Sequence, residues 1–433
     1  MNCASLWSPP RIIKLPSCLR AIFLYGWKRS FASNAARAQR RRDKQDSWMW
    51  RNVKTPVPFH ALAKNDLEPS LEAVSSNTTS TFICSYSWQH SKKKGVRIPG
   101  VAPIWRNVSL PVTVPPDSKT VFTARNLPQA PRYYFEPLFR AAATMNPSVN
   151  FMDVDIVTTR NSLRKLFAFC GGVGLTSFRV DLSMIHNTLF IERFEKTSRA
   201  IMGGAEETGY GSSFEKASTI LPREAKNCVQ YHRALKYMLG ELNCVVSFEV
   251  DAFYQNLDED GKKEEDETTN NTMLEELASD IGAPGIRSDT PRNEGMAVQM
   301  PTVEADTKLT PQSAAAEIKT TTKDFGSFSR HLPQLWFGRT PWLIRARHSG
   351  GTFDRILIRR AGDEFTAWEE EHQTELRRLV SLLSQLREVV KENGSKRCIG
   401  IFERRARDLE INLFVSARKT GALAGNMISK FWR

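Results

Sequence analysis

Residues 245–253 read VVSFEVDAF, and residues 314–320 read AAAEIKT. Both stretches are short and rich in apolar residues, which predicts two buried strands far apart in the chain that lie side by side. Side chains two positions apart point to the same face of a strand. Two pairs of charged residues therefore share a face: Glu249 with Asp251, and Glu317 with Lys319.

The apolar residues between these charges give each strand an opposite, core-facing side. Val246, Phe248 and Val250 alternate with the acidic residues of the first stretch, and Ile318 does so in the second. Carboxylates gathered on rigid strands repel one another unless a divalent cation neutralises them, so the pattern predicts a magnesium or manganese site. A lysine beside such a cation is suited to phosphodiester cleavage.

Spacing alone is weak evidence for this site. Residues 264–266, EED, and residues 224–226, EAK, match the same short patterns but lie in polar surroundings. Short motifs of this kind recur by chance in a chain with many charged residues. The prediction therefore rests on the apolar strands around the charges, and solvated ion pairs on an inert fold remain the alternative.

Composition indicates a globular chain with a strongly basic beginning. The 433 residues carry a formal net charge of +14. Residues 1–54 hold twelve Lys or Arg against two Asp, so ten of the fourteen excess charges lie there. Any phosphate-binding groove must then be a local patch. Seven cysteines without a C-x-x-C pair argue against structural zinc and disulfides, and no apolar run is long enough to span a membrane.

The composition divides the chain into four parts. Residues 1–54 are expected to be a mitochondrial targeting segment, with a basic disordered tail of a nuclear or cytoplasmic protein as the alternative. Residues 55–80 are rich in Pro, Ser, Thr and Asn and predict a linker. Residues 81–425 predict one nuclease-like domain, interrupted by a disordered acidic and polar insertion at 255–310.

Predicted strands and helices interleave throughout residues 81–425. We expect a helix at 136–145, a strand and helix at 154–169, a β-pair around His186-Asn187, and one long amphipathic helix at 364–392. This order predicts an α/β domain in which helices flank a mixed β-sheet.

The order of motifs resembles that of the DXO family of decapping exoribonucleases, within the PD-(D/E)XK nuclease superfamily. Five stretches carry the resemblance: DIVTTR at 155–160, GYGSSFE at 209–215, EVD at 249–251, EIKT at 317–320 and QLWFGRT at 334–340. It covers about residues 81–416 and implies the mixed-sheet nuclease core of that superfamily.

The resemblance also implies roles for individual residues. By this resemblance the catalytic residues are Glu215, Asp251, Glu317 and Lys319. The metal ligands are Glu215, Glu249, Asp251, Glu317 and the carbonyl of Ile318. Substrate-binding roles fall to Arg160, beside RNA phosphates, to Glu249, and to Arg339, which stands where the family carries a glutamine near the active site.

The function implied is metal-dependent hydrolysis at RNA 5′ ends, by decapping, pyrophosphate removal or 5′–3′ exonuclease action. RNA is then the expected partner, a 5′–3′ exoribonuclease is a second candidate partner, and no membrane partner is expected. Two alternatives stay open: a catalytically weakened RNA-binding or partner-stimulating protein of the same fold, and a DNA nuclease of the same superfamily. Other catalytic patterns are absent, since Gly171–Gly174 lacks the lysine of a phosphate loop and no G-x-S-x-G elbow occurs.

Overall fold

The computed structural model describes residues 46–89, 95–117, 121–122, 132–173, 175–194, 199–200, 209–225, 227–255, 297–299, 310–394, 396–404 and 408–433. The chain divides into two units, Met1–Arg51 and Asn52–Arg433. In the first, the described part is a single 3-10 turn, Ser47–Trp50. The remainder of the predicted targeting segment, and nearly all of the predicted insertion, lie outside the described residues.

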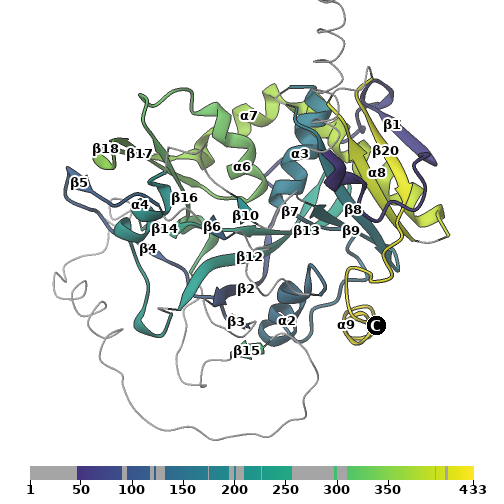
Figure 1. The fold of residues 1–433 in the computed structure, drawn as a ribbon, viewed down its shortest axis with the longest axis horizontal. Coiled ribbons are helices and arrows are strands. Elements are labelled where there is room, and N and C mark those ends of the chain that lie inside the picture. Colours follow the sequence, from purple (N-terminus) through teal and green to yellow (C-terminus); the bar gives the residue numbers. More distant parts are fainter. Residues whose placement is uncertain are drawn as a thin grey trace, which may run out of the picture. The chain divides into compact units, whose positions relative to one another are not determined.

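The second unit is built on two large mixed sheets (Figure 1). The larger sheet has eleven strands in the order β1-β20-β19-β8-β9-β7-β13-β12-β2-β3-β15. Its strands are β1 (His60–Ala63), β2 (Thr81–Gln89), β3 (Gly95–Arg97), β7 (Ile156–Thr159), β8 (Phe178–Ile185), β9 (Thr188–Phe194), β12 (Cys228–Leu239), β13 (Leu242–Glu249), β15 (Ala297–Gln299), β19 (Arg397–Phe402) and β20 (Glu410–Val415). Strand β7 is parallel to both of its neighbours, β13 and β9, whereas β12 and β13 form an antiparallel hairpin.

The smaller sheet has seven strands in the order β11-β4-β14-β16-β17-β18-β5. They are β4 (Ile104–Trp105), β5 (Val112–Thr113), β11 (Thr219–Ile220), β14 (Ala252–Phe253), β16 (Ala315–Thr321), β17 (Trp342–Ser349) and β18 (Thr352–Arg360). Strands β6 (Val121–Phe122) and β10 (Arg199–Ala200) pair separately. The expected mixed-sheet α/β architecture is confirmed, with two large sheets in place of one.

Seven described α-helices cover these sheets: α2 (Glu136–Met145), α3 (Arg160–Gly171), α4 (Gly211–Ser218), α6 (Leu332–Phe337), α7 (Phe365–Glu371), α8 (Gln373–Glu392) and α9 (Gly425–Phe431). One apolar cluster joins α3, α6, α7 and α8 to the larger sheet. A second apolar cluster joins α2 and α9 to the same sheet. Successive residues of strand β13 belong to different clusters, because Val246 lies in the first cluster and Val245 in the second. The larger sheet is therefore covered on both faces.

Helix α3 shows how local sequence signals position a functional element. The Thr159 side chain caps the helix by accepting a hydrogen bond from the Ser162 amide at 3.2 Å, and Gly172 ends it in the left-handed conformation at φ 72°. Leu163 and Leu166 are fully buried along one face. Helix α3 therefore begins at Arg160, directly after strand β7.

Three expectations differ from the structure in detail. The strand expected at 245–253 is two strands in different sheets, because the chain leaves the larger sheet after Glu249 and enters the smaller one at Ala252. The helix expected at 364–392 breaks at His372, where φ −115° and ψ 18° leave the helical region and Nδ1 contacts the Trp368 carbonyl at 2.9 Å. The expected linker, 55–80, contains β1, which pairs with β20.

The expected linker also contributes to the core, which explains why it is ordered. Leu62, Leu67 and Val74 are buried in the cluster that contains α3 and α8. Within the expected insertion, Ala297–Gln299 forms β15 and pairs with β3. None of the described helices is long and apolar enough to cross a membrane.

Candidate active site

The two sheets meet where the chain passes from β13 to β14. Glu249 ends β13, and Asp251 lies between the strands. Strand β14 pairs with β16 in the register Ala252 with Ala316, so Asp251 lies next to the middle of β16. One carboxylate oxygen of Asp251 accepts a hydrogen bond from the Ile318 amide at 2.9 Å. This bond fixes the acidic residue of one strand on the backbone of the other.

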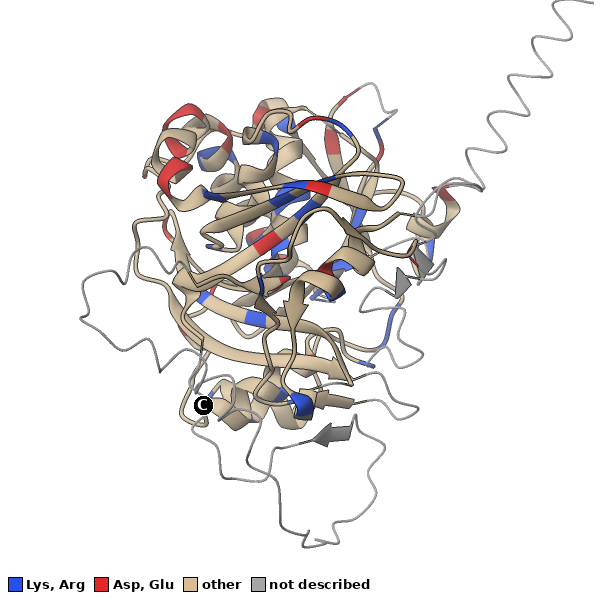
Figure 2. Ribbon diagram, turned by 90° about the vertical axis from the view of Figure 1, so that its left-hand side faces the viewer, with Lys and Arg blue, Asp and Glu red and all other residues tan. Residues whose placement is uncertain are grey.

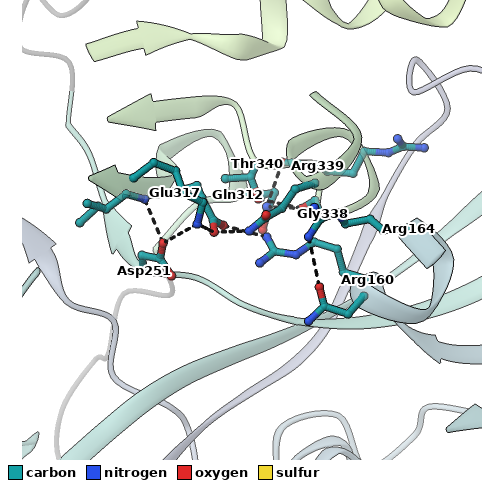
Figure 3. A network of polar contacts seen from close by, with 12 residues as sticks. Arg160, Arg164, Asp251, Gln312, Glu317, Gly338, Arg339 and Thr340 are labelled. Atoms are coloured by element: carbon teal, nitrogen blue, oxygen red, sulfur yellow. Dashed lines mark hydrogen bonds and ion pairs between the residues drawn. The ribbon is translucent and has the colours of Figure 1, made fainter. Parts of the chain in front are cut away.

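Glu317 is the most heavily bonded carboxylate of the site and is 2 % exposed. Its Oε2 accepts a hydrogen bond from Arg160 Nη1 at 3.0 Å (Figure 3). Its Oε1 accepts one from Lys319 Nζ at 2.5 Å and another from Gln334 Nε2. Lys319 Nζ also lies 4.0 Å from Asp251 Oδ2. The structure therefore brings Asp251, Glu317 and Lys319 together.

Arg160 reaches Glu317 from the start of helix α3, directly after strand β7 of the larger sheet. It is the first residue of α3, and its guanidinium lies 5.6 Å from the Phe248 ring. Gly338 leaves room for it, because a Cβ at that position would lie 3.1 Å from Arg160 Cδ and 3.2 Å from its Nη1. Arg160 is 5 % exposed, so its charge depends on Glu317 for compensation.

Glu215 approaches the same region from helix α4. Asp117 holds the start of that helix, because its carboxylate accepts hydrogen bonds from the Ser212 amide at 3.2 Å and the Ser213 amide at 2.7 Å. Phe214, beside Glu215, is fully buried and stacks on Phe353 with 4.1 Å between ring centroids. Capping and packing thus orient the helix that carries Glu215.

The electrostatics of the four carboxyl groups show mutual repulsion. Burial and the charge of Glu249 raise the pKa of Glu215 to about 7. Burial and Glu317 raise the pKa values of both Glu249 and Asp251. Three of the four carboxyl groups are therefore held above their ordinary pKa in a shared, poorly solvated space.

Glu317 and Lys319 behave in the opposite way. Burial alone would raise the pKa of Glu317, but Arg160 and Lys319 outweigh it and lower this pKa to about 2. Burial alone would lower the pKa of Lys319, but Glu317 and Asp251 raise it. Glu317 is thus ionised, and Lys319 is protonated at neutral pH.

The donor chemistry of this cluster fits a divalent cation, since buried carboxylates that repel one another are the oxygen ligands that Mg²⁺ and Mn²⁺ prefer. In the arrangement described, however, no three Asp, Glu, His or Cys side chains of the described residues are gathered as a metal site. Both Glu317 oxygens are instead bound to Arg160, Lys319 and Gln334. The carboxylates expected as ligands lie in this region, but the oxygens of Glu317 are bound to nitrogen donors.

Two residues predicted for the site lie differently from the rest. The Ile318 side chain packs in the core of the smaller sheet, and only its backbone faces Asp251. Arg339 contacts none of these carboxylates: its guanidinium lies 4.3 Å from the Tyr237 ring and 4.2 Å from the Trp336 ring, and its Nη1 donates to the Trp336 carbonyl. The glutamine that contacts the site is Gln334, five residues earlier.

The sequence analysis missed three further residues. Gln334 belongs to the QLWFGRT stretch of the resemblance, which gives it no role, although a lone amide among the apolar residues of this stretch is a usable signal. Gln230 is hydrogen-bonded to Glu249. His232 pairs with Glu249 in the β12–β13 register and stacks on Tyr86 at 5.0 Å, and burial together with Arg160 lowers its pKa to about 3. Nothing in the sequence marked strand β12 as part of the site.

Comparisons with known proteins agree with this architecture. A family model described as a domain of unknown function, DUF8563, matches residues 57–432. No curated protein matches the chain significantly. The fold matches solved structures of Rai1 proteins, which belong to the DXO family, so the predicted resemblance is confirmed at the level of the fold.

Three of these structures illustrate the match. S. pombe Rai1 in complex with 3′-FADP has a TM-score of 0.51 and 12 % identity, over 82 % of this chain and 98 % of that one. Candida albicans Rai1 in complex with pU5-Mn²⁺ has a TM-score of 0.53 and 12 % identity, over 86 % and 98 %. Scheffersomyces stipitis Rai1 with (3′-NADP)⁺ and calcium has a TM-score of 0.50 and 14 % identity, over 87 % and 95 %.

Proposed function

This chain belongs to the DUF8563 family, and from that premise and its Rai1-like fold we propose that it is a metal-dependent hydrolase of phosphodiester or pyrophosphate bonds at RNA 5′ ends. One observation carries the proposal: the buried Glu317 and the half-buried Glu249 and Asp251 lie where the two sheets meet, beside Arg160 and Lys319, and the half-buried Glu215 on α4 interacts with them electrostatically. Such surplus negative charge on rigid strands calls for a cation.

Structural neighbours support this choice of substrate and cofactor. The Candida albicans Rai1 structure contains pU5-Mn²⁺, and the Scheffersomyces stipitis one contains (3′-NADP)⁺ and calcium. In the present chain Asp251, Glu317, Glu215 and Glu249 would hold a magnesium or manganese ion, together with the Ile318 carbonyl. The ion would supply Lewis-acid stabilisation of negative charge on the phosphoryl group.

The chain's own residues have separate tasks in the proposed reaction. Lys319 stays protonated beside Glu317 and Asp251, so it can orient the nucleophile and offset charge that develops on phosphate. Arg160 lies at the start of α3 with its guanidinium on Glu317, and it would transfer its hydrogen bonds to a substrate phosphate. Burial and Glu249 raise the pKa of Glu215 to about 7 in the metal-free protein, and a bound cation would hold this carboxyl group ionised as a ligand.

A basic face beside the site fits a nucleic-acid strand. Lys319 on β16 pairs with Arg345 on β17, so the two side chains lie on the same face of the smaller sheet. Arg345 lies 5.0 Å from the Phe325 ring, and Arg359 lies 4.3 Å from the Phe328 ring. Figure 2 shows basic residues on the strands of this side, interrupted by acidic ones. Cations interleaved with aromatic rings are typical of single-strand binding surfaces.

Part of this charge is already compensated. Asp324 and Asp354 both bind Arg347, each with a closest contact of 2.7 Å. Arg345 is 5 % exposed and its Nη1 donates to the Gly326 carbonyl at 2.9 Å, so a phosphate on this face would meet the exposed Arg330 rather than Arg345. Desolvation of the His331 ring, together with the charges of Arg330, Lys319 and Arg345, lowers the pKa of His331 to about 4.

A second function is favoured by the contacts of Glu317. Its two oxygens are bound to Arg160, Lys319 and Gln334, which leaves the central carboxylate committed to nitrogen donors. A protein whose ligands stayed in this arrangement would bind RNA 5′ ends without cutting them. This is the catalytically weakened RNA-binding protein, and a DNA nuclease of the same chemistry is the remaining alternative.

One experiment separates these functions. The full chain is incubated with manganese and end-labelled RNAs that carry a 5′-triphosphate, a cap or a 5′-monophosphate, and with single-stranded DNA. We expect cleavage of RNA that disappears in the Asp251→Asn and Glu317→Gln variants. Binding of RNA without cleavage by the wild type would support the weakened protein, and preferential cutting of DNA would support the third function. Equal residual activity in wild type and both variants would reject the hydrolase.

A further inference from the structure

The solvent side of helix α3 continues outward from the candidate active site and carries two further cations. After Arg160, the residues of α3 that are half-buried rather than buried are Asn161, Arg164, Lys165, Ala168 and Gly171. Residues three and four apart lie on the same side of a helix, so this set forms a single stripe. Arg164 lies one turn on from Arg160, about 6 Å along the helix axis (Figure 3).

The strands beside this helix end at the same edge of the larger sheet. Strand β7 is parallel to both β13 and β9, so the carboxyl ends of the three strands meet. Glu249 ends β13, Arg160 follows β7, and Arg193 is the last residue but one of β9. Ligands of sheets with parallel strands bind beside the carboxyl ends of those strands. Along this edge the charge therefore changes from acidic at β13 to basic at β7 and β9.

The cations at the basic end of this edge repel one another. Burial and the charges of Arg193 and Arg164 lower the pKa of Lys165 to about 8. Burial and the charge of Arg160 lower the pKa of Arg164, and the attraction of Glu317 offsets only part of this. Cations on a fully solvated face are screened from one another by water, so this cluster is held closer together than an ordinary charged surface.

The two α3 cations have no ion pair with a carboxylate in the part of the chain that the structure describes. Arg164 Nη1 donates to Asn161 Oδ1 at 3.4 Å, and Lys165 makes no ion pair there. Glu317 attracts Arg164, but both of its oxygens already accept hydrogen bonds from other side chains. Cations gathered in this way attract an anion, just as the neighbouring carboxylates attract a cation.

The basic face of the smaller sheet is more fully compensated than this edge. Asp324 and Asp354 bind Arg347 there, and Glu364 binds Arg359. Of the two basic regions beside the candidate active site, the α3 edge therefore attracts a polyanion more strongly.

We propose that Arg164, Lys165 and Arg193 bind phosphates of the single-stranded RNA chain that follows the 5′ end, so that the strand leaves the carboxylates along α3. This inference rests on the proposed function, because it takes the 5′ end to lie at Glu317 and Arg160. A nucleic-acid strand carries one negative charge on every nucleotide, which matches cations that follow one another away from Arg160. Guanidinium groups add paired, charge-assisted hydrogen bonds to phosphate.

The salt dependence of binding measures these phosphate contacts without any cleavage. Fluorescence anisotropy in EDTA would follow a labelled oligouridylate with a 5′-monophosphate as it binds the full chain, over a series of potassium chloride concentrations. Each phosphate contact contributes about 0.7 to the slope of log affinity against log salt for a single strand. The double variant Arg164→Gln/Lys165→Gln should therefore lower this slope by about 1.4. At low salt it should weaken binding by about tenfold or more.

A matched control makes the same change of charge at the opposite edge of the same strands. Lys391→Gln/Lys430→Gln alters α8 and α9. Arg387 of α8 binds the residue before β7 at 2.9 Å, and Trp432, directly after α9, donates to the first residue of β9 at 3.0 Å. Both control positions thus belong to helices at the amino ends of these strands, and this variant should keep the slope and the affinity of the wild type.

A variant that preserves charge guards against a merely structural effect. Arg164→Lys/Lys165→Arg keeps both cations and should keep the slope of the wild type. Should the double glutamine variant fail to fold, the single variants Arg164→Gln and Lys165→Gln take its place, and each should lower the slope by about 0.7. The basic residues 1–54 are present in every variant, so differences between variants report on α3.

The outcomes separate this inference from the proposed function. An unchanged slope in the α3 variant, with RNA cleavage in manganese intact, would overturn the path along α3 and leave the hydrolase standing. A lowered slope without any cleavage would support the path and reject the hydrolase.

Three further results would overturn the path. The first is RNA binding by the wild type that does not depend on salt. The second is a lowered slope in Arg330→Gln but not in the α3 variant, which would move the strand to the smaller sheet. The third is an oligoglutamate of equal charge that displaces the RNA as well as unlabelled RNA does, which would make an acidic peptide the ligand of α3.

Discussion

Two buried charge clusters in this protein contain similar residues but differ in balance. The candidate active site has four carboxylates, Glu215, Glu249, Asp251 and Glu317, against the two cations Arg160 and Lys319. The second cluster, on β8, β9 and the segment after β20, has two of each: Arg179, Arg418, Asp181 and Glu192. Counted over these residues, the first cluster has more carboxylates than cations, and the second has equal numbers.

The charged side chains of the second cluster form ion pairs with one another. Arg179 Nε lies 2.6 Å from Asp181 Oδ1, and Arg418 Nη1 lies 2.9 Å from Asp181 Oδ2 and 3.4 Å from Glu192 Oε2. The Arg179 guanidinium also stacks on Phe194 at 4.0 Å. Both clusters contain charged residues two positions apart on a strand. Charge balance, rather than spacing, therefore separates a structural ion cluster from a candidate cation site.

The largest expected difference between the clusters is in catalysis. Asp251→Asn and Glu317→Gln should each lower RNA cleavage by about 10³-fold or more, because each removes a ligand of the proposed cation. Asp181→Asn should leave the cleavage rate per folded molecule within a few-fold of the wild type. The measurement is the single-turnover rate with manganese, normalised to folded protein by circular dichroism. Equal losses at Asp181 and Asp251 would remove the distinction between the two clusters.

Stability should respond in the opposite order. Asp181→Asn leaves Arg179, whose side chain is 0 % exposed, with an incomplete partner, and we expect a loss of about 3 kcal/mol in the free energy of unfolding. Asp251→Asn relieves repulsion among carboxylates and should leave the metal-free protein as stable as the wild type or more so. Urea unfolding in EDTA measures both. A destabilised Asp251→Asn variant would mean that the acidic cluster is structural as well.

The sequence predicted the parts of the site that depend on local periodicity. The spacing of Glu317 with Lys319 put both residues on one strand, β16, because strand alternation is a local property, whereas Glu249 ends β13 in the larger sheet and Asp251 lies between β13 and β14. The sequence did not reveal that the chain changes sheets at Asp251, since the alternation of apolar and acidic residues continues from Phe248 through Ala252.

Contacts between distant segments could not be predicted in this way. Gln334 and Arg339 lie on one short stretch, and only the angle of α6 against β16 decides that Gln334 meets Glu317. Strand β1 was hidden because its few apolar residues stand among prolines and serines and bury themselves against β20 and α8. The break at His372 depends on packing against Trp368, with 4.8 Å between ring centroids, so helical periodicity continued across it.

Divalent metal should stabilise one cluster only. Manganese at about 100 times its dissociation constant should add about 2.7 kcal/mol to the free energy of unfolding of the wild type. The same addition of manganese should change the free energy of unfolding of Asp251→Asn very little. Asp181→Asn is less stable without metal, but manganese should raise its free energy of unfolding as much as that of the wild type. Thermal unfolding with manganese and with EDTA gives the comparison. A gain that survives in Asp251→Asn would place the metal elsewhere in the chain.

The smallest expected effect concerns pH and Glu215. Its pKa in the folded protein is raised from 4.5 to about 7, so the folded state holds this proton more tightly than the unfolded state does. Between pH 4.5 and 7 the folded state therefore loses stability as pH rises. Glu215→Gln removes that loss, and in EDTA it should be more stable than the wild type at pH 8, by on the order of 1 kcal/mol, and equal to it at pH 4.5. Manganese should reverse the order at pH 8, because the ionised Glu215 then has a cation to bind. Urea unfolding at the two pH values checks the sign, and a Glu215→Gln advantage that is independent of pH would show that packing, rather than the buried charge, sets the difference.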